Sequence, residues 1–273
     1  MAAMPTTPVI LLPPSEGKLA GGDGPKWGPG TCSFPALDRT RRQVMAALVE
    51  AMKEPEASRS KLLGVKGEAL TTATAGNLAV RRSPTMAAIH RYTGVLYDAL
   101  DATGLRKRAL GRLESDVVIF SGLFGAVMAG DPIPDYKLKM GGALPGIGNT
   151  SLLWRSPLTE ALTGFVSGRV LWNLLPKEHD NAWVCPTPAT GRTMSVKFLD
   201  EQARAPRGPR QFTTVNHWNK LLKGALVRHI LTTGADEPDA LVDFDHPEGY
   251  VYDSSLTEVV DGRIMLAMVR PPV

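Results

Sequence analysis

The sequence is poor in cysteine, with Cys32 and Cys185 as the two thiols among 273 residues. Two thiols so far apart make neither a disulfide framework nor a four-ligand zinc site. The five histidines are scattered, without the H-x-x-x-H spacing that places two metal ligands on one helix face. We therefore expect a reducing compartment and no structural metal, and the sequence identifies no cofactor. Iron or zinc held by histidine and carboxylate side chains from distant segments stays an open alternative.

Long apolar runs are also missing. No stretch approaches the roughly 20 consecutive apolar residues that a membrane-spanning helix needs. Residues 1–8 lack a basic segment followed by an apolar run, so they do not predict a secretion signal, and we expect them to be flexible. A cytoplasmic protein without a membrane partner is the expectation. Hydrophobic residues make up 43% of the chain and charged residues 21%, which is ordinary for a globular protein and predicts one domain over residues 1–273.

Acidic residues are absent from residues 203–235, although this segment contains six basic ones. Residues 236–262 reverse the pattern, with nine acidic residues and neither lysine nor arginine. The net charge of the whole chain is only +4. Such asymmetry indicates either a surface that binds a polyanion or two segments that pair with each other, and the sequence leaves both interpretations open.

Short apolar segments alternate with segments of helical spacing, a pattern that predicts a mixed α/β sheet with helices packed on it. The spacing predicts helices over Leu37–Lys53 and Thr213–Leu231. The apolar runs predict strands over Val9–Leu12, Asp116–Phe120, Arg169–Leu175, Met194–Leu199 and Arg263–Val269. The alternation of apolar and basic residues predicts a half-exposed strand over Tyr136–Met140.

A first candidate site, Pro13–Lys18, directly follows the first predicted strand, where α/β sheets carry their ligand-binding loops. Ser15 can form hydrogen bonds, Glu16 can act as an acid or base, and Lys18 can neutralise an anion. The G-x-x-x-x-G-K-[ST] spacing of a phosphate-binding loop is absent. The alternative is a proline-stiffened turn with a solvated Glu–Lys pair.

Two further candidates lie near the C-terminus. In the predicted helix over Thr213–Leu231, Lys220, Lys223 and Arg228 could contact phosphates, and Gly224 indicates close contact with another backbone or a ligand. The alternative there is a surface helix with ordinary lysines. A second group follows, in which Glu248 and Tyr250, beside Asp243 and Asp245, could supply acid–base chemistry or a cation site. An acidic turn that neutralises the basic helix would explain that group equally well.

Two short glycine-containing strings resemble the hairpin of a helix-hairpin-helix DNA module, in which backbone N–H groups approach a phosphate. The first, Leu63–Gly67, has helical composition on both sides and would present Gly64, Lys66 and Gly67. The second, Leu144–Gly148, fits the hairpin consensus better but follows a segment that alternates like a strand.

Taken in order, a set of segments covering nearly the whole chain resembles the YaaA peroxide-stress family. These segments are Val9–Lys18, Gly94–Leu100, Phe120–Gly125, Asp135–Gly141, Trp154, Asn173–Leu174, Val196–Asp200, Lys220–Arg228 and Pro247–Tyr250. The resemblance implies a compact α/β fold, a role in limiting damage by hydrogen peroxide, and a basic cleft that binds DNA through a helix-hairpin-helix element at Leu62–Ala69. The first loop reads Pro-Pro-Ser-Glu-Gly-Lys, which marks a subgroup distinct from the Ser-Pro-Ala-Lys form of the peroxide-stress members.

Two functional hypotheses follow. The leading one is a stress protein that binds DNA or a nucleotide phosphate, with the Leu63–Gly67 hairpin adding backbone donors to a set of basic side chains, Lys18, Lys137, Lys139, Lys220, Lys223 and Arg228. The rival is an enzyme acting on a nucleotide, a nucleoside or another phosphorylated small molecule, with the chemistry carried by Ser15, Glu16, Glu248 and Tyr250.

Overall fold

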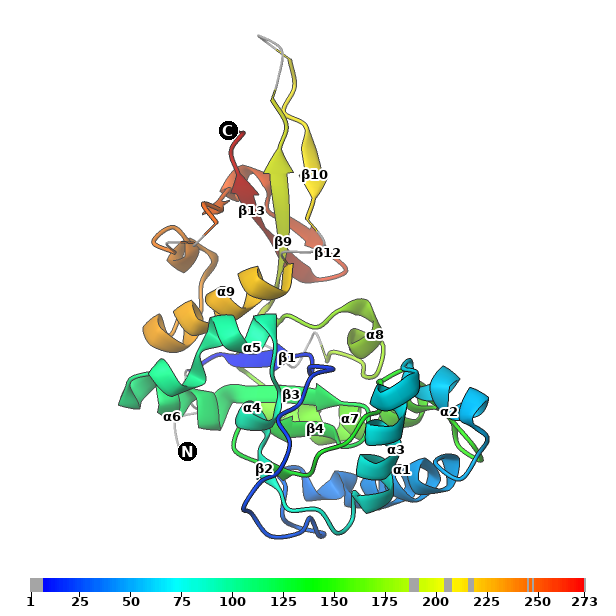
Figure 1. The fold of residues 1–273 in the computed structure, drawn as a ribbon. Helices are drawn as coiled ribbons and strands as arrows, with labels where there is room; N and C mark the ends of the chain where they lie inside the picture. The colour runs from blue at the N-terminus through cyan, green and yellow to red at the C-terminus, as the bar shows by residue number, and fades with distance from the viewer. Residues whose placement is uncertain are drawn as a thin grey trace.

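The computed structural model describes residues 7–186, 192–203, 208–215, 219–244, 246 and 248–272 (Figure 1). The expectation of a flexible N-terminus concerns residues 1–8, of which 1–6 lie outside these ranges. Thr7 and Pro8 are described: Pro8 is buried, and the Thr7 hydroxyl donates to Asp116 at 3.2 Å. None of the helices in the described ranges is long and apolar enough to span a lipid bilayer.

One large mixed sheet runs through the molecule, and its β9, β10 and β13 strands extend away from the helices (Figure 1). Within the described residues it has nine strands, of which β13, β9, β8, β1 and β3 run parallel to their neighbours in this order. Strands β4, β10, β11 and β12 pair antiparallel at its margins. The bounds are β1 (Val9–Leu12), β3 (Val117–Ser121), β4 (Gly125–Met128), β8 (Val170–Asn173), β9 (Arg192–Glu201), β10 (Phe212–Thr214), β11 (Val251–Tyr252), β12 (Glu258–Val260) and β13 (Arg263–Arg270).

Helices cover this sheet, so the expected mixed α/β fold is confirmed. They are α1 (Asp38–Ala51), α2 (Glu56–Leu63), α3 (Gly67–Ala79), α4 (Ala88–Arg91), α5 (Val95–Leu100), α6 (Lys107–Asp116), α7 (Thr150–Val166), α8 (Lys177–Asp180) and α9 (Asn219–Thr233). Two short antiparallel pairs complete the regular structure, β2 (Met86–Ala87) with β5 (Pro132–Ile133) and β6 (Ala143–Leu144) with β7 (Gly148–Asn149).

The central strands are apolar throughout because both of their faces are covered. Every residue of β1 and β3 is buried, and Ile10 lies opposite Val117 in the parallel register. Continuous apolar runs of this length are typical of parallel strands between two layers of helices. The strands predicted at Val9–Leu12 and Asp116–Phe120 are therefore confirmed, with shifts of one residue at the second.

Two local predictions are wrong, and one of the two candidate DNA-binding hairpins has another structure. Tyr136–Met140 forms no strand, because the backbone of Lys137 pairs with the side chain of Asn77 in α3. The helix expected from Thr213 begins at Asn219, since Phe212–Thr214 form β10 against β9. Leu144–Gly148 is the turn of the β6–β7 hairpin, so it does not connect two helices.

The charge reversal near the C-terminus is partly resolved by pairing. Arg210 of the acid-free segment contacts Asp253 of the acidic segment at 2.6 Å, and also Glu201 at 2.8 Å. These contacts tie the loop before β10 to the part of the sheet formed by β9 and β13. The interpretation in which the two segments pair is therefore supported at this point of the structure.

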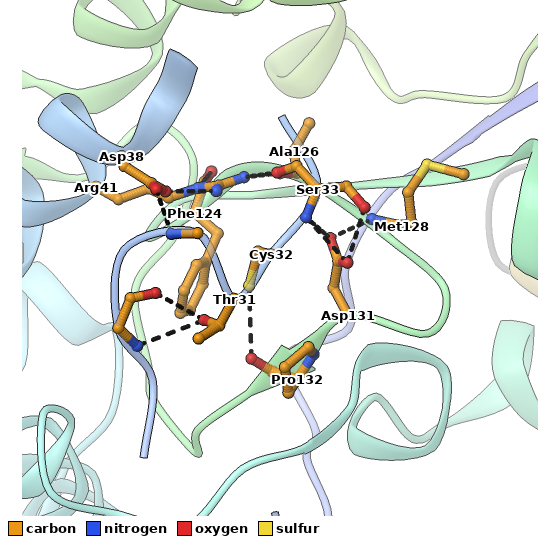
Figure 2. A network of polar contacts seen from close by, with 12 residues as sticks. Thr31, Cys32, Ser33, Asp38, Arg41, Phe124, Ala126, Met128, Asp131 and Pro132 are labelled. Atoms are coloured by element: carbon orange, nitrogen blue, oxygen red, sulfur yellow. Dashed lines mark hydrogen bonds and ion pairs between the residues drawn. The ribbon is translucent and has the colours of Figure 1, made fainter. Parts of the chain in front are cut away.

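A buried arginine anchors the loop before α1 to the turn between β3 and β4 (Figure 2). The guanidinium of Arg41 has no exposed surface and donates to the carbonyl oxygens of Ser33, Phe124 and Ala126 at 2.7–3.1 Å. Its remaining contact is an ion pair with Asp38 at 2.8 Å. One side chain thus joins two backbone segments that are distant in the sequence, the loop at Ser33 and the turn at Phe124–Ala126.

Candidate functional site

The candidate site lies where three parallel strands end. β1 leads into Pro13–Lys18, β3 into the turn at Gly122, and β8 into Leu174–Pro176 and α8. Because the carboxyl ends of parallel strands meet at one edge of a sheet, these loops lie together. β1 is the middle strand of the three, so its loop occupies the crevice between the other two.

The loop after β1 is held in place by a short antiparallel pairing with the segment after α4. Lys18 forms a β-bridge with Tyr92, the Leu19 N–H donates to the Arg91 carbonyl at 2.8 Å, and the Thr93 N–H donates to the Gly17 carbonyl at 3.1 Å. This pairing gives the Lys18 side chain a fixed direction.

Lys18 points into a cage of aromatic rings. Its Nζ lies 4.4 Å from the ring centroid of Tyr136 and 5.3 Å from that of Tyr92, and it donates to the Ser15 carbonyl at 3.2 Å. Burial lowers the pKa of this lysine to about 8, although Asp135 acts in the opposite direction. Lys18 is therefore still mainly protonated at pH 7.

A chain of hydrogen-bonded hydroxyl groups holds the two tyrosine rings of this cage in place. The Tyr92 and Tyr136 hydroxyls are 2.7 Å apart, and the Tyr136 hydroxyl lies 2.6 Å from Ser121 Oγ. Ser121 Oγ in turn accepts from the Phe124 N–H at 2.9 Å. Burial raises the pKa of Tyr136 to about 12 and holds that of Tyr92 well above its usual value, so both phenols stay neutral and serve as hydrogen-bonding supports.

Two more lysines converge on Glu16. Lys137 Nζ lies 3.6 Å from Glu16 Oε2, and Lys139 Nζ lies 4.0 Å from Glu16 Oε1. The backbone of Lys137 is fixed by Asn77, whose amide donates to its carbonyl at 2.9 Å and accepts from its N–H at 2.8 Å. The acidic side chains Asp135 and Glu178 also line the surrounding cavities.

The turn between α2 and α3 adjoins these lysines. Gly64 ends α2 with a φ of 68°, and a Cβ atom there would lie 3.0 Å from Lys139 Nζ. Gly67 begins α3, and Lys66 is exposed directly before it. The helices predicted on both sides of Leu63–Gly67 are thus present, and they bring this turn to the same surface as Lys139.

In the described part of the chain, three adjoining cavities share Glu16 in their walls. One of about 450 Å³ lies between Lys18, Lys137 and a face of α3. A smaller one of about 120 Å³ includes Lys139 and Glu178. The third, of about 690 Å³, lies on the other side of the Ser15–Gly17 segment.

The structure separates the predicted lysines into two groups. Lys18, Lys137 and Lys139 surround Glu16, whereas Lys220 and Lys223 line the largest cavity. Lys220 is exposed at the start of α9, and Lys223 Nζ donates to the Leu174 carbonyl at 3.0 Å. The spacing of lysines along the sequence could not show which of them lie around Glu16 and which line the other cavity.

Arg228 lies apart from both groups. Its guanidinium donates to the carbonyls of Leu100, Asp101 and Gly104 at 2.7–3.2 Å and pairs with the Asp101 carboxylate at 3.1 Å. These contacts satisfy the carbonyls at the end of α5. The phosphate contact predicted for Arg228 stays a prediction. In the structure this side chain joins α9 to the end of α5 and so stabilises the fold.

Glu248 and Tyr250 are not brought to Ser15 and Glu16. The Tyr250 hydroxyl donates to Asp200 of β9 at 2.6 Å, and Glu248 lies close to this pair, on the loop before β11. Neither residue lines any of the three cavities around Glu16. The four candidate catalytic residues therefore do not form one site.

Sequence reasoning missed His179, which the structure brings to the site. It lies on α8, lines two of the cavities, and burial lowers its pKa to about 4. Its position four residues after the predicted strand over Arg169–Leu175 was the available signal. In the described residues, no cluster of three or more His, Cys, Asp or Glu side chains could hold a metal ion.

Comparison with known proteins places this chain in a family. The model of the family described as peroxide stress protein YaaA matches residues 9–256. A UPF0246 protein of Streptomyces coelicolor is 36% identical over 244 residues, which cover 89% of this chain and 90% of that protein. UPF0246 proteins of Corynebacterium glutamicum and Corynebacterium efficiens are each 37% identical, over 81% and 82% of this chain and 83% and 85% of their own lengths. The chain therefore belongs to the YaaA peroxide-stress protein family.

Proposed function

We propose that this chain is a cytoplasmic protein of peroxide defence that binds DNA through its phosphates at Lys18, Lys137 and Lys139. The observation that carries the proposal is the convergence of two ammonium groups on the single carboxylate of Glu16, beside a third, caged lysine. Glu16 is 69% exposed at its side chain, so an incoming phosphate can replace it. Lysines of this kind neutralise phosphates without reading the base sequence.

The turn at Gly64–Gly67 supports the same proposal. Lys139 lies against Gly64, so the turn and the lysines present one surface to a ligand. The first N–H groups of α3 have no partners within their own helix and carry the positive end of the helix dipole. A phosphate that contacts Lys139 would then also receive backbone donors from the α2–α3 turn.

Replacing both Lys137 and Lys139 by glutamine is the direct test. We expect the slope of log affinity against log salt for duplex DNA to become shallower by about 1.8, and the affinity near 0.1 M salt to fall roughly sixtyfold. Glu16→Gln should have the opposite effect on affinity, because it removes a carboxylate that repels phosphate. Salt-titrated fluorescence anisotropy would measure both. Lys107→Gln, at the start of α6 and remote from α2 in Figure 1, is the matched control. Affinity that is insensitive to salt, or unchanged in the double variant, would disprove the proposal.

The two thiols are not expected to act as peroxide sensors. Cys32 is 4% exposed, and burial raises the pKa of its thiol to about 11, with Asp131 adding to the effect. Burial also raises the pKa of Cys185. Because the thiolate is the reactive form, we expect Cys32 in the folded protein to be alkylated roughly a hundredfold more slowly at pH 7 than in the urea-unfolded chain. Mass spectrometry after timed iodoacetamide treatment would measure this. Rapid modification of Cys32 in the native protein would contradict the expectation.

A further inference from the structure

The largest of the three cavities has the character of a small-molecule site. Its volume is about 690 Å³, and it lies between the loop after β1, the first turn of α5, α8 and the start of α9. Cavities of about 300–1,000 Å³ are typical of sites for small organic ligands. It shares Ser15 and Glu16 with the lysine group, but Lys137 and Lys139 do not line it.

Apolar surfaces form much of its wall. Pro13 and Pro14 contribute from one side, Val95 and Leu96 from α5, and Pro176 from the loop before α8. Val95 is 50% exposed, so part of this apolar surface is open to solvent. Flat proline and aliphatic surfaces of this kind favour packing against a ring.

Two cations complete the other end of the cavity. Lys220 is exposed, and within the described residues it forms no hydrogen bond or ion pair. Lys223 is held by the Leu174 carbonyl at 3.0 Å, which leaves two of its three N–H donors available. Burial lowers the pKa of Lys223 to about 8, so it still carries its charge at pH 7. A ligand with an anionic group would satisfy both side chains.

His179 adds an unsatisfied polar edge. Both of its ring nitrogens are buried, and neither has a hydrogen-bond partner among the described residues. With a pKa of about 4 the ring is neutral at pH 7, so one nitrogen donates and the other accepts. Buried polar atoms without partners cost free energy. The bonding directions of the two ring nitrogens diverge, so a base edge can supply a partner to one of them once the ring turns toward the cavity.

We propose that this cavity binds a nucleoside 5′-monophosphate, with its heterocyclic base between the proline and Val95–Leu96 surfaces, its hydrogen-bonding edge at His179 and its phosphate at Lys220 and Lys223. A base supplies a flat ring and an edge with donors and acceptors, and the phosphate supplies the anion. The inference rests on other cations than DNA binding at Glu16 does, because Lys220 and Lys223 do not belong to that lysine group, although both sites share Ser15 and Glu16.

Isothermal titration with AMP, GMP, CMP and UMP tests the proposal, with the parent nucleosides and ribose 5-phosphate as partial ligands. We expect at least one monophosphate to bind at least tenfold more tightly than its nucleoside and than ribose 5-phosphate. The inference would be overturned if none of the four bound, or if ribose 5-phosphate bound as well as the nucleotides.

Variants locate the binding. His179→Phe and Lys220→Met should each weaken the nucleotide at least tenfold, and Lys220→Met should leave the affinity for duplex DNA unchanged. Lys220 is exposed, so its substitution does not threaten folding, and a urea unfolding midpoint would confirm that His179→Phe folds. The Lys137→Gln/Lys139→Gln variant is the converse control and should keep its nucleotide affinity. If the nucleotide instead weakened only in that double variant, it would occupy the Glu16 lysines and the assignment of this cavity would be wrong.

Discussion

Replacing Arg41 by methionine is expected to lower the free energy of unfolding by about 3–5 kcal/mol, a large part of the stability of an ordinary domain. The change leaves the Asp38 carboxylate, which is 11% exposed, without its ion-pair partner. It also leaves the carbonyls of Phe124 and Ala126 without their arginine donor. Urea unfolding followed by tryptophan fluorescence would measure the loss.

The exposed pair of Lys53 and Glu50 provides the control for this prediction. Both side chains are more than 60% exposed, at 62% and 64%, so Lys53→Met should change stability by less than about 1 kcal/mol. The double variant Asp38→Asn/Arg41→Met should recover part of the loss, because no unpaired charge remains buried. A loss in Arg41→Met as small as that in Lys53→Met would show that the buried contacts of Figure 2 add little to stability.

Gly224→Ala is expected to destabilise the protein by about 1–3 kcal/mol, although alanine is the better helix former. The Cβ atom would overlap the carbonyl oxygen of Leu96 and lie 2.8 Å from the Cβ of Ala99, both in α5. Helices α5 and α9 would have to separate, and both contribute residues to the wall of the largest of the three cavities. Thermal unfolding would measure the change.

Gly111→Ala is the matched control for Gly224→Ala. Gly111 lies within α6, is exposed, and has no atom within 4 Å of the position of an added Cβ. Its substitution should therefore stabilise the protein, by about 0.4–1 kcal/mol. Opposite signs at the two glycines would establish that the α5–α9 contact, and not helix propensity, governs residue 224. Stabilisation at both positions would mean that the helices are not closely packed there.

The strands that carry the site could be predicted because each is a local signal. The apolar run at Val9–Leu12 and the prolines that end it are visible in the sequence, and the loop that follows lies at the sheet edge where α/β proteins bind ligands. The interpretation of Gly224 as a close backbone contact is likewise confirmed, since its neighbour is the carbonyl of Leu96. Both predictions depended on only a few consecutive residues.

Contacts between distant segments could not be predicted in the same way. The alternation over Tyr136–Met140 is typical of a strand, yet Asn77, 60 residues earlier, takes the backbone hydrogen bonds that a neighbouring strand would have supplied. Tertiary packing also decides which lysines lie around Glu16 and which line the largest of the three cavities. Lys137 and Lys220 look alike in the sequence, as ordinary surface lysines, yet they lie in different groups. Hydrophobic patterns and local propensities do not predict contacts between residues that are distant in the sequence.

The aromatic cage around Lys18 has an entropic consequence for binding. A free lysine side chain loses up to about 2 kcal/mol of rotamer freedom when a ligand immobilises it. Lys18 has already lost much of this freedom on folding, because two tyrosine rings and the Ser15 carbonyl hold its ammonium group. Lys220 keeps its freedom until a ligand arrives. A phosphate that reaches Lys18 therefore meets a donor already set in direction, and contact with it is less costly in entropy than contact with a mobile lysine at the surface.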